Sequence, residues 1–223
     1  MFACPQIRIF PAEDPMITIA INGACGRMGS RLIQLVREDG DLKLVAALER
    51  QGHPSLGADI GQLHGCGTLG VPLTEALTGK ADVLIDFTVP ESTVARAAQC
   101  AERGVAMVIG TTGLTDEQKK AIERATHRVP CFMAPNMSVG VNLLFDVAAQ
   151  VAKALGQEYD IEIVEAHHRF KKDAPSGTAL KLAEKIAQAT GRDLAQDAVY
   201  GRHGITGERK RKEIGVHAVR CGD

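Results

Sequence analysis

The chain has 223 residues, of which 45% are hydrophobic and 24% charged, and its formal net charge at pH 7 is −1. This length and apolar content suit two modest domains, and the balanced charge excludes a general basic field for nucleic acid or membrane surfaces. The six cysteines include no C-x-x-C pair, which favours reduced thiols in a cytoplasmic protein over a disulfide framework or a zinc site. We find no apolar run of membrane-spanning length and no signal-peptide core, and we interpret residues 1–15 as a frayed extension.

The first part of the chain alternates strand-like with helix-like patterns. Apolar runs typical of strands buried on both faces occur at 17–21, 42–48, 82–87, 105–109 and 131–134, with a short edge strand at 71–73. Helical patterns follow most of these runs; one opens at Pro90 and closes at Gly104, and another opens with a capping box over 115–118. Residues 51–70 lack periodicity and are interpreted as a loop. The succession predicts a Rossmann-like parallel sheet with helices on both faces, in a dinucleotide-binding domain of residues 1–137.

A glycine-rich turn joins the first strand to the first helix. Residues 23–29 read G-A-C-G-R-M-G, so glycine recurs at every third position. Glycine allows the backbone to turn tightly and to approach a pyrophosphate, which lies at the helix N-terminus. Glu49 follows Gly29 by about 20 residues, at the end of the second strand, where such folds keep the acid that binds the adenosine ribose. Arg50 suits the 2′-phosphate of NADPH, so we expect that both NADH and NADPH can bind. The combination of strand, glycine turn, helix and acid favours a dinucleotide-binding site over a plain tight turn.

Small and hydroxylated residues follow another of the predicted strands. Gly110, Thr111, Thr112 and Gly113 come directly after the run at 105–109. The carboxyl ends of parallel strands face the ligand crevice in such sheets. We therefore expect this segment to face the cofactor.

The pattern changes after Ser138 and predicts an α+β domain of residues 138–223. A helix over 141–155 carries an apolar stripe that we interpret as ordinary core. Alternation at 160–165 indicates a strand with one wet face, which predicts a mixed or antiparallel second sheet, and a helix over 179–187 and a strand over 216–220 follow. The basic run 209–212 lies among glycines, and we favour a solvated loop over a binding patch there.

The segment 165–179 contains the densest group of titratable side chains. Five side chains that are or can become cationic fall within six positions: His167, His168, Arg169, Lys171 and Lys172. Pro175, Ser176, Gly177 and Thr178 then open a helix, where free backbone N–H groups favour an anion. A solvated basic surface would explain the group equally well by itself. The combination with a helix opening predicts a site for a small acidic ligand.

These motifs together resemble the dihydrodipicolinate reductase family, now described as 4-hydroxy-tetrahydrodipicolinate reductases. The resemblance rests on segment 165–179 and, in order, on residues 23–29, 49–50, 86–88, 110–113 and 136–142, and it runs from about Ile17 to Asp223. It implies NAD(P)H-dependent reduction of 4-hydroxy-tetrahydrodipicolinate to tetrahydrodipicolinate in lysine and diaminopimelate biosynthesis. It also implies a cytoplasmic homotetramer that binds a small cyclic dicarboxylate and no metal.

The resemblance assigns roles to particular residues. It implies catalytic acid/base roles for His167 and Lys171, and contacts to the substrate carboxylates for His168, Gly177 and Thr178. It implies cofactor contacts for Gly23, Ala24, Cys25, Gly26, Arg27, Met28, Glu49, Arg50, Gly110, Thr111, Thr112, Ala134, Pro135, Asn136 and Met137.

Two alternatives remain open from the sequence. One is another amino-acid-pathway dehydrogenase, acting on aspartate or its semialdehyde, although that reading leaves the His-His-x-x-Lys cluster unexplained. The other is a non-catalytic nucleotide-binding remnant, because family members continue past the position that matches Asp223. We therefore expect the substrate-binding and oligomerisation domain to lack its C-terminal part.

Overall fold

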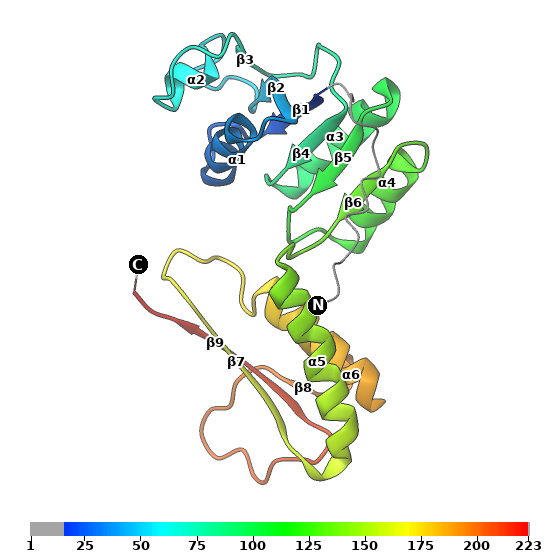
Figure 1. Cartoon of the computed structure of the whole chain (residues 1–223). Helices are drawn as coiled ribbons and strands as arrows, with labels where there is room; N and C mark the ends of the chain where they lie inside the picture. The colour runs from blue at the N-terminus through cyan, green and yellow to red at the C-terminus, as the bar shows by residue number, and fades with distance from the viewer. Residues whose placement is uncertain (1–15, 223) are drawn as a thin grey trace, which may run out of the picture. The chain divides into compact units, whose positions relative to one another are not determined.

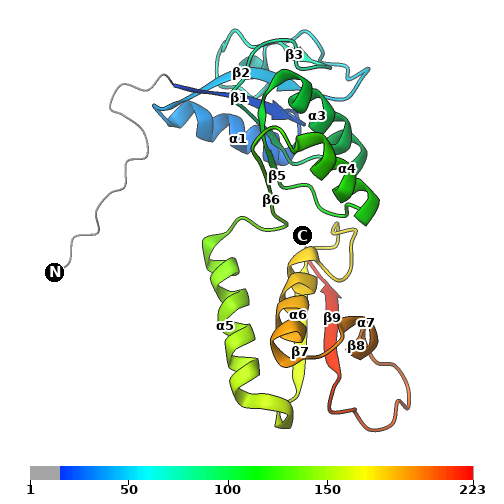
Figure 2. The same cartoon turned by 90° about the vertical axis from the view of Figure 1, so that its right-hand side faces the viewer.

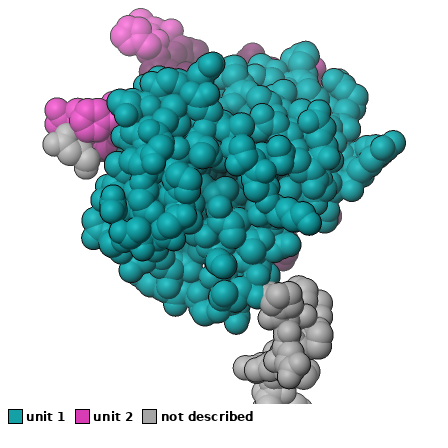
Figure 3. Space-filling view, turned by 90° about the horizontal axis from the view of Figure 1, so that it is seen from above, with its two compact units in different colours: residues 1–133 teal, residues 134–223 magenta. Residues whose placement is uncertain are grey.

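The structure, a computed structural model, describes residues 16–222 (Figure 1). The predicted frayed extension at 1–15 lies outside the described residues. The chain forms two compact units, residues 1–133 and residues 134–223, coloured teal and magenta in Figure 3. Each unit has its own sheet and its own hydrophobic core.

The first unit contains a six-stranded parallel sheet, which confirms the predicted Rossmann-like fold class. Its strands are β1 (Ile17–Asn22), β2 (Leu42–Leu48), β3 (Leu73–Thr74), β4 (Val83–Asp86), β5 (Ala106–Ile109) and β6 (Cys131–Met133). Their order is β3-β2-β1-β4-β5-β6. The order reverses between β1 and β4, where Asn22 lies opposite Asp86 at the last paired position. A crevice for a ligand is expected outside the carboxyl ends of the strands at such a reversal.

Helices cover both faces of this sheet (Figure 2). Side chains from α1 (Arg27–Glu38) and α2 (Ile60–Leu63) join the core on one face, and those from α3 (Pro90–Arg103) and α4 (Asp116–Thr126) join the core on the other. The predicted helix ends are confirmed: Thr115 and Gln118 form a capping box, and Gly104 ends α3 with φ +69°. Periodicity did not predict α2, because Asp59 fixes this four-residue helix by accepting from the Gly61 and Gln62 amides.

The second unit packs two long helices on one face of a three-stranded sheet. Its elements are α5 (Val139–Leu155), the 3₁₀ helix η1 (Gly156–Glu158), β7 (Ile161–His167), α6 (Gly177–Thr190), α7 (Leu194–Asp197), β8 (Ala198–Val199) and β9 (Ile214–Arg220). The strand order is β7-β9-β8, and both described pairings are parallel. The prediction of a mixed or antiparallel arrangement is therefore wrong for the described strands. The alternation along β7 arises because helices cover only one face of this sheet, an arrangement more typical of antiparallel sheets, since parallel sheets are usually covered on both faces.

Helix α5 differs from its interpretation as core. Within α5 only Phe145 is buried, and its exposed large apolar residues are Val139, Leu143, Leu144, Val147, Val151 and Leu155. By length and composition the segment Val139–Glu158 would also suit a membrane span, contrary to the expectation of no such run. One such helix is weak evidence for a span, and α5 packs Ala148 and Ala152 against the core that α6 shares with the sheet.

The basic run at 209–212 is tied to acidic groups. Arg209 donates to Asp160 (2.7 Å) and to Glu162 (2.8 Å), and Arg211 donates to Glu158 (3.0 Å). Arg202 also pairs with Glu162 (2.9 Å), and hydrogen bonds from Arg202, with Arg209 and His217, lower the pKa of that carboxyl to about 2. The run lies in a loop in which Lys210, Arg211 and Lys212 are exposed, as predicted, and Arg209 and Arg211 are in addition paired with acidic side chains.

Candidate active site

The glycine turn after β1 has a backbone that excludes larger residues. Gly23 has φ +72°, and a Cβ atom there would meet the Thr88 methyl group at 2.5 Å. A Cβ atom on Gly29 would lie 2.2 Å from the Gly23 carbonyl oxygen, inside any allowed contact. The amides of Gly23 and Ala24 both donate to the Leu48 carbonyl, at 2.9 and 3.0 Å, which ties the turn to the end of β2.

The N-terminus of α1 offers unsatisfied donors to an anion. Its N-cap is Gly26, which has no side chain to accept from the first helical amides, and the first turn contains no acidic residue. These amides carry the positive end of the helix dipole. A pyrophosphate therefore fits this helix end, with the glycines allowing its close approach.

Glu49 lies directly against the turn. One of its carboxylate oxygens accepts from the Cys25 amide at 3.3 Å, and the other accepts from the Arg50 amide at 3.0 Å. Burial, followed by the charge of Glu49, raises the pKa of the Cys25 thiol, which is therefore neutral at pH 7. The structure thus brings the predicted acid at the end of β2 together with the predicted glycine turn.

A buried polar cluster supports the turn, and the sequence argument assigned it no role. Asn22 donates to the Ser92 hydroxyl (3.0 Å) and accepts from Arg96 Nε (3.1 Å), while Thr88 donates to Asp86 at 2.6 Å. Asp86 is fully buried, and its second carboxylate oxygen has no partner among residues 16–222. The position of Asp86 at a strand end was the available signal; Arg96 gave none, because it lies inside a regular helix.

His64 also holds the turn and was missed. Its Nε2 atom donates to the Ala24 carbonyl at 2.9 Å, and its Nδ1 atom lies 3.2 Å from the Ser30 hydroxyl. Because a carbonyl can only accept, the proton on Nε2 is fixed by this contact. His64 lies in the aperiodic stretch 51–70, where no pattern could assign it to the turn.

The second unit gathers charged groups where β7 and β9 end. His167 lies opposite Arg220 in the strand register. Glu165 accepts from His167 Nδ1 (2.5 Å), from both terminal nitrogens of Arg220 (2.9 and 3.1 Å) and from the Ser176 amide (3.0 Å). A single carboxylate therefore joins the catalytic candidate, a neighbouring strand and the start of α6.

Glu165 stays ionised in this position although the residue is buried, with only 9% of its surface exposed. Burial would raise its pKa, but the hydrogen bonds from Arg220, His167 and the Ser176 amide together lower the pKa to about 2. Because Glu165 accepts from Nδ1, that atom of His167 carries a proton. Among the described residues, the other ring nitrogen, Nε2, has no hydrogen-bond partner, and the side chain is about one-third exposed.

Two further residues of the basic cluster, His168 and Lys171, are oriented by local contacts, whereas Arg169 and Lys172 are exposed. His168 Nδ1 accepts from the Phe170 amide at 3.2 Å, so its Nε2 carries the proton in the neutral ring. Lys171 Nζ donates to Asp173 at 2.7 Å and is only 21% exposed. These side chains are constrained within the described residues and are not freely solvated.

The opening of α6 lies where the sequence predicted a site for an anion. Ser176 is the N-cap and accepts from the Ala179 amide at 3.2 Å. Gly177 and Thr178 are the first helical residues and are half-buried. Asn136 donates to the Thr178 hydroxyl at 3.3 Å, which brings the predicted segment 134–137 to this helix end.

Two family profiles match the chain. One, described as "Dihydrodipicolinate reductase, N-terminus", matches residues 17–137, and the other, described as "Dihydrodipicolinate reductase, C-terminus", matches residues 140–223. The chain belongs to the dihydrodipicolinate reductase family. This membership confirms the resemblance read from the motifs.

Similar proteins extend this result along most of the chain. The 4-hydroxy-tetrahydrodipicolinate reductase of Hahella chejuensis is 52% identical over 211 residues, which cover 93% of this chain and 79% of that protein. The protein of the same name from Methanothermobacter thermautotrophicus is 49% identical over 217 residues, with the same coverage. A solved dihydrodipicolinate reductase from Paenisporosarcina sp. TG-14, with dipicolinate bound, has a TM-score of 0.65 and 31% identity, covering 92% of this chain and 78% of its own.

The remaining cofactor residues implied by the dihydrodipicolinate reductase resemblance lie in two places. A Cβ atom on Gly110 would overlap the Phe87 ring at 1.9 Å, so this position requires glycine for packing. The Thr111 hydroxyl is buried and accepts from the Thr88 amide at 3.0 Å, while Thr112 is exposed. Residues 134–137 belong to the second unit. Their contacts with a cofactor stay predictions.

Proposed function

We propose that the chain catalyses the NAD(P)H-dependent reduction of 4-hydroxy-tetrahydrodipicolinate to tetrahydrodipicolinate, in lysine and diaminopimelate biosynthesis. This proposal is based mainly on sequence identity of 52% and 49%, over 93% of the chain, with two proteins named for this reaction. The charged group around Glu165 and the open N-terminus of α6 support it, because they suit a small ring with carboxylates.

The first unit is proposed to hold the cofactor, with NADH and NADPH both accepted. The pyrophosphate would lie against residues 23–28, where the glycines leave room and the α1 amides lack a side-chain cap. Glu49 would accept from the ribose hydroxyls, and the exposed Arg50 would meet a 2′-phosphate. When bound, the cofactor supplies a hydride to the substrate.

The second unit is proposed to hold the dicarboxylate. The amides of Gly177 and Thr178 would donate to one carboxylate, with the dipole of α6 adding a positive potential. His168 would donate to a carboxylate from Nε2, because its Nδ1 already accepts from a backbone amide. Dipicolinate, the ligand named in the solved relative, is also a ring with two carboxylates.

His167 is proposed to move protons through Nε2. Glu165 accepts from Nδ1 and stays ionised, so it orients the ring and stabilises the imidazolium form that carries a proton on each nitrogen. The reaction takes up a hydride and a proton and releases the 4-hydroxyl group as water, so it requires an acid near the leaving oxygen or the ring. Lys171, held by Asp173, is the second proposed proton donor.

A spectrophotometric assay tests this function. The full chain is mixed with enzymatically generated 4-hydroxy-tetrahydrodipicolinate, and oxidation of NADH or NADPH is followed. We expect substrate-dependent oxidation with either cofactor. Cofactor binding without turnover would contradict the proposal and favour a non-catalytic nucleotide-binding protein.

Location and assembly are also part of the proposal. We place the protein in the cytoplasm, which is consistent with the five free cysteines among residues 16–222. We further propose the homotetramer that the family resemblance implies, with residues 138–223 providing the substrate site and the subunit contacts. Light scattering on the purified chain would contradict the tetramer if it gave the mass of a monomer.

A further inference from the structure

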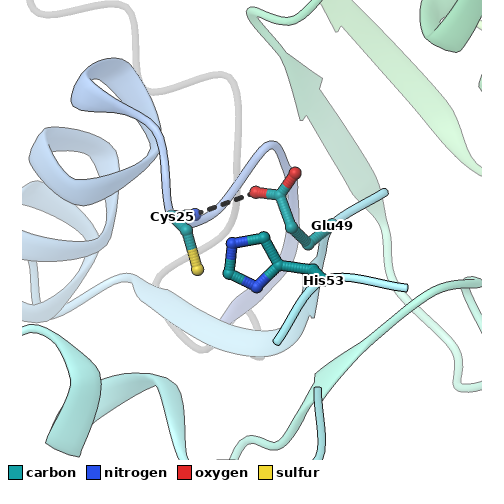
Figure 4. Close-up of side chains that lie close together, drawn as sticks. All are labelled: Cys25, Glu49 and His53. Carbon is teal, nitrogen blue, oxygen red and sulfur yellow. Dashed lines mark hydrogen bonds between the residues drawn. The ribbon is translucent and has the colours of Figure 1, made fainter. Parts of the chain in front are cut away.

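Three side chains of the kinds that bind transition metals meet beside the glycine turn. Cys25, Glu49 and His53 each present a ligand atom, and these three atoms all lie within 4.8 Å of one another. Figure 4 shows the His53 ring beside the Cys25 thiol and the Glu49 carboxylate, with a ring nitrogen on the side that faces them. Sequence spacing could not reveal this group, because Cys25 lies in the glycine turn after β1, whereas Glu49 and His53 follow β2.

The backbone holds Cys25 and Glu49 in a fixed relation. The Cys25 amide donates to Glu49 at 3.3 Å, as drawn in Figure 4. The preceding amides of Gly23 and Ala24 bind the Leu48 carbonyl, so the turn cannot move away from the end of β2 without losing these bonds. Two of the three ligands are therefore supported by neighbouring secondary structure.

His53 is placed by a tight turn after β2. Its amide donates to the Arg50 carbonyl at 3.2 Å, and Gly52 supplies the left-handed backbone at φ +71°. The Gly52 amide in turn donates to Glu75 at 3.1 Å, which fastens the loop to the segment after β3. The imidazole is thus presented by a loop with its own hydrogen bonds.

We propose that Cys25, Glu49 and His53 form a binding site for Zn²⁺ or a similar borderline-soft divalent cation. Sulfur, imidazole nitrogen and carboxylate oxygen are the three ligand types of protein zinc sites, and three protein ligands leave a fourth position open. A thiolate and a carboxylate balance the charge of the ion. Tetrahedral zinc places such ligand atoms about 3.4–3.6 Å apart, so separations within 4.8 Å need to contract by at most about 1.4 Å, which side-chain rotation can supply.

Metal binding would remove one proton, from Cys25, and break one hydrogen bond, at His53. The Cys25 thiol must lose its proton to the solvent when the metal–sulfur bond forms. His53 Nδ1 accepts from the Ser55 amide at 3.3 Å, so coordination through Nε2 moves the ring proton to Nδ1 and breaks this single long bond. Neither change disturbs the sheet or its helices.

The site would exclude the cofactor. Cys25 and Glu49 are among the residues proposed to contact the dinucleotide, so a metal on them would occupy the carboxylate that the ribose needs. Zinc is therefore expected to inhibit in competition with NADH or NADPH. This consequence rests on the proposed function, whereas metal binding itself does not.

Spectroscopy with Co²⁺ tests the ligands directly. The full chain, reduced with a non-thiol reductant, is titrated with Co²⁺ and the near-ultraviolet thiolate-to-cobalt band is recorded; Zn²⁺ is then added to displace it. We expect one Co²⁺ per chain, loss of the band in Cys25→Ser, and affinity at least about tenfold weaker in His53→Gln. Cys66→Ser and His127→Gln, which change a half-buried thiol and an exposed imidazole of the same unit, should match the parent. A band that survives Cys25→Ser, or unchanged affinity in His53→Gln, would overturn the site.

A second measurement tests the competition. Zn²⁺ affinity is determined with and without saturating NADPH, and we expect an apparent weakening of at least about tenfold in its presence. Zn²⁺ affinity that is independent of bound NADPH would overturn the competitive role. If NADPH does not bind at all while the Co²⁺ band follows the variants as expected, the metal site is supported and the proposed function fails.

Discussion

The glycine turn of the first unit and the charged group of the second unit are built in different ways. The turn depends on backbone geometry within a few residues, with Gly23 and Gly29 leaving space that a Cβ atom would fill. The charged group depends on side chains far apart in sequence, because Arg220 reaches Glu165 across 55 positions. A local motif is therefore sufficient to identify the turn, whereas the second group is complete only when β9 pairs with β7.

The largest expected effect comes from the imidazole held by Glu165. We predict that His167→Gln lowers turnover about 100- to 1,000-fold, because the proposed acid is lost, while the Kd of NADPH stays within about twofold. Steady-state kinetics and a fluorescence titration of the cofactor measure the two quantities. His203→Gln, which changes an exposed histidine of the same unit, is the matched control and should behave as the parent. Near-parental turnover in His167→Gln would remove its proton-transfer role.

The glycine turn is expected to bind the cofactor less well when a side chain is added at Gly29. We predict that Gly29→Ala weakens NADH and NADPH binding by more than about tenfold and lowers the free energy of unfolding by about 1–3 kcal/mol, because its Cβ meets the Gly23 carbonyl. Calorimetric titration and thermal unfolding provide both values. Gly40→Ala is the control, since nothing lies within 4 Å of the added atom. Equal effects of the two substitutions would show that the close approach is unimportant.

The long-range pair is expected to affect stability in a pH-dependent way. We predict that Arg220→Gln lowers the free energy of unfolding at pH 7 by about 1–3 kcal/mol, because it leaves a buried carboxylate with fewer donors. The low pKa of Glu165, about 2, stabilises the fold above the ordinary glutamate value of 4.5. That contribution is lost as the pH falls from about 5 towards 2.

Denaturant unfolding of parent and Arg220→Gln at pH 7 and pH 3 measures this dependence. The difference between the two proteins should be larger at pH 7 and smaller at pH 3, where the unfolded-state carboxylate is protonated. Arg211→Gln, which removes an exposed pair with Glu158, should change stability by less than about 1 kcal/mol at either pH. A difference between parent and Arg220→Gln that grows on acidification would contradict the role given to Glu165.

The smallest effect on cofactor binding is expected from Arg50, which follows β2. We predict that Arg50→Ala weakens NADPH about three- to tenfold and NADH by less than twofold, because only NADPH has a 2′-phosphate and the arginine is exposed. Competitive titration of both cofactors measures the ratio. Lys43→Ala, an exposed cation on β2, is the control. Equal weakening of both cofactors would remove the assignment of Arg50 to the phosphate.

The sequence predicted most of the first unit, because its signals are local. Buried apolar runs, the capping box at Thr115 and the glycine turn each act over a few residues, and each appears where it was expected. The prediction from sequence failed where a contact or a strand direction depends on residues far apart in the chain. The parallel direction of β9, the pairing of Arg220 and the contact of His64 with Ala24 are set by tertiary packing that no spacing records.

Helix α5 illustrates the same limit in another form. Its apolar stripe predicted a core helix, but apolar residues continue around most of its surface and only Phe145 is buried. Periodicity identifies the side that packs on α6, and the rest of the helix is apolar for reasons that this packing does not explain. The second unit is thus less completely encoded in local pattern than the first.

Transfer of an isotope from cofactor to product tests the central claim most directly. The full chain is incubated with 4-hydroxy-tetrahydrodipicolinate and NADPH that carries deuterium at the transferable position of the nicotinamide ring, and the product is analysed by mass spectrometry. The account predicts tetrahydrodipicolinate that has gained a single deuterium, formed in step with cofactor oxidation. Unlabelled product, or oxidation of the cofactor without formation of this product, would contradict it.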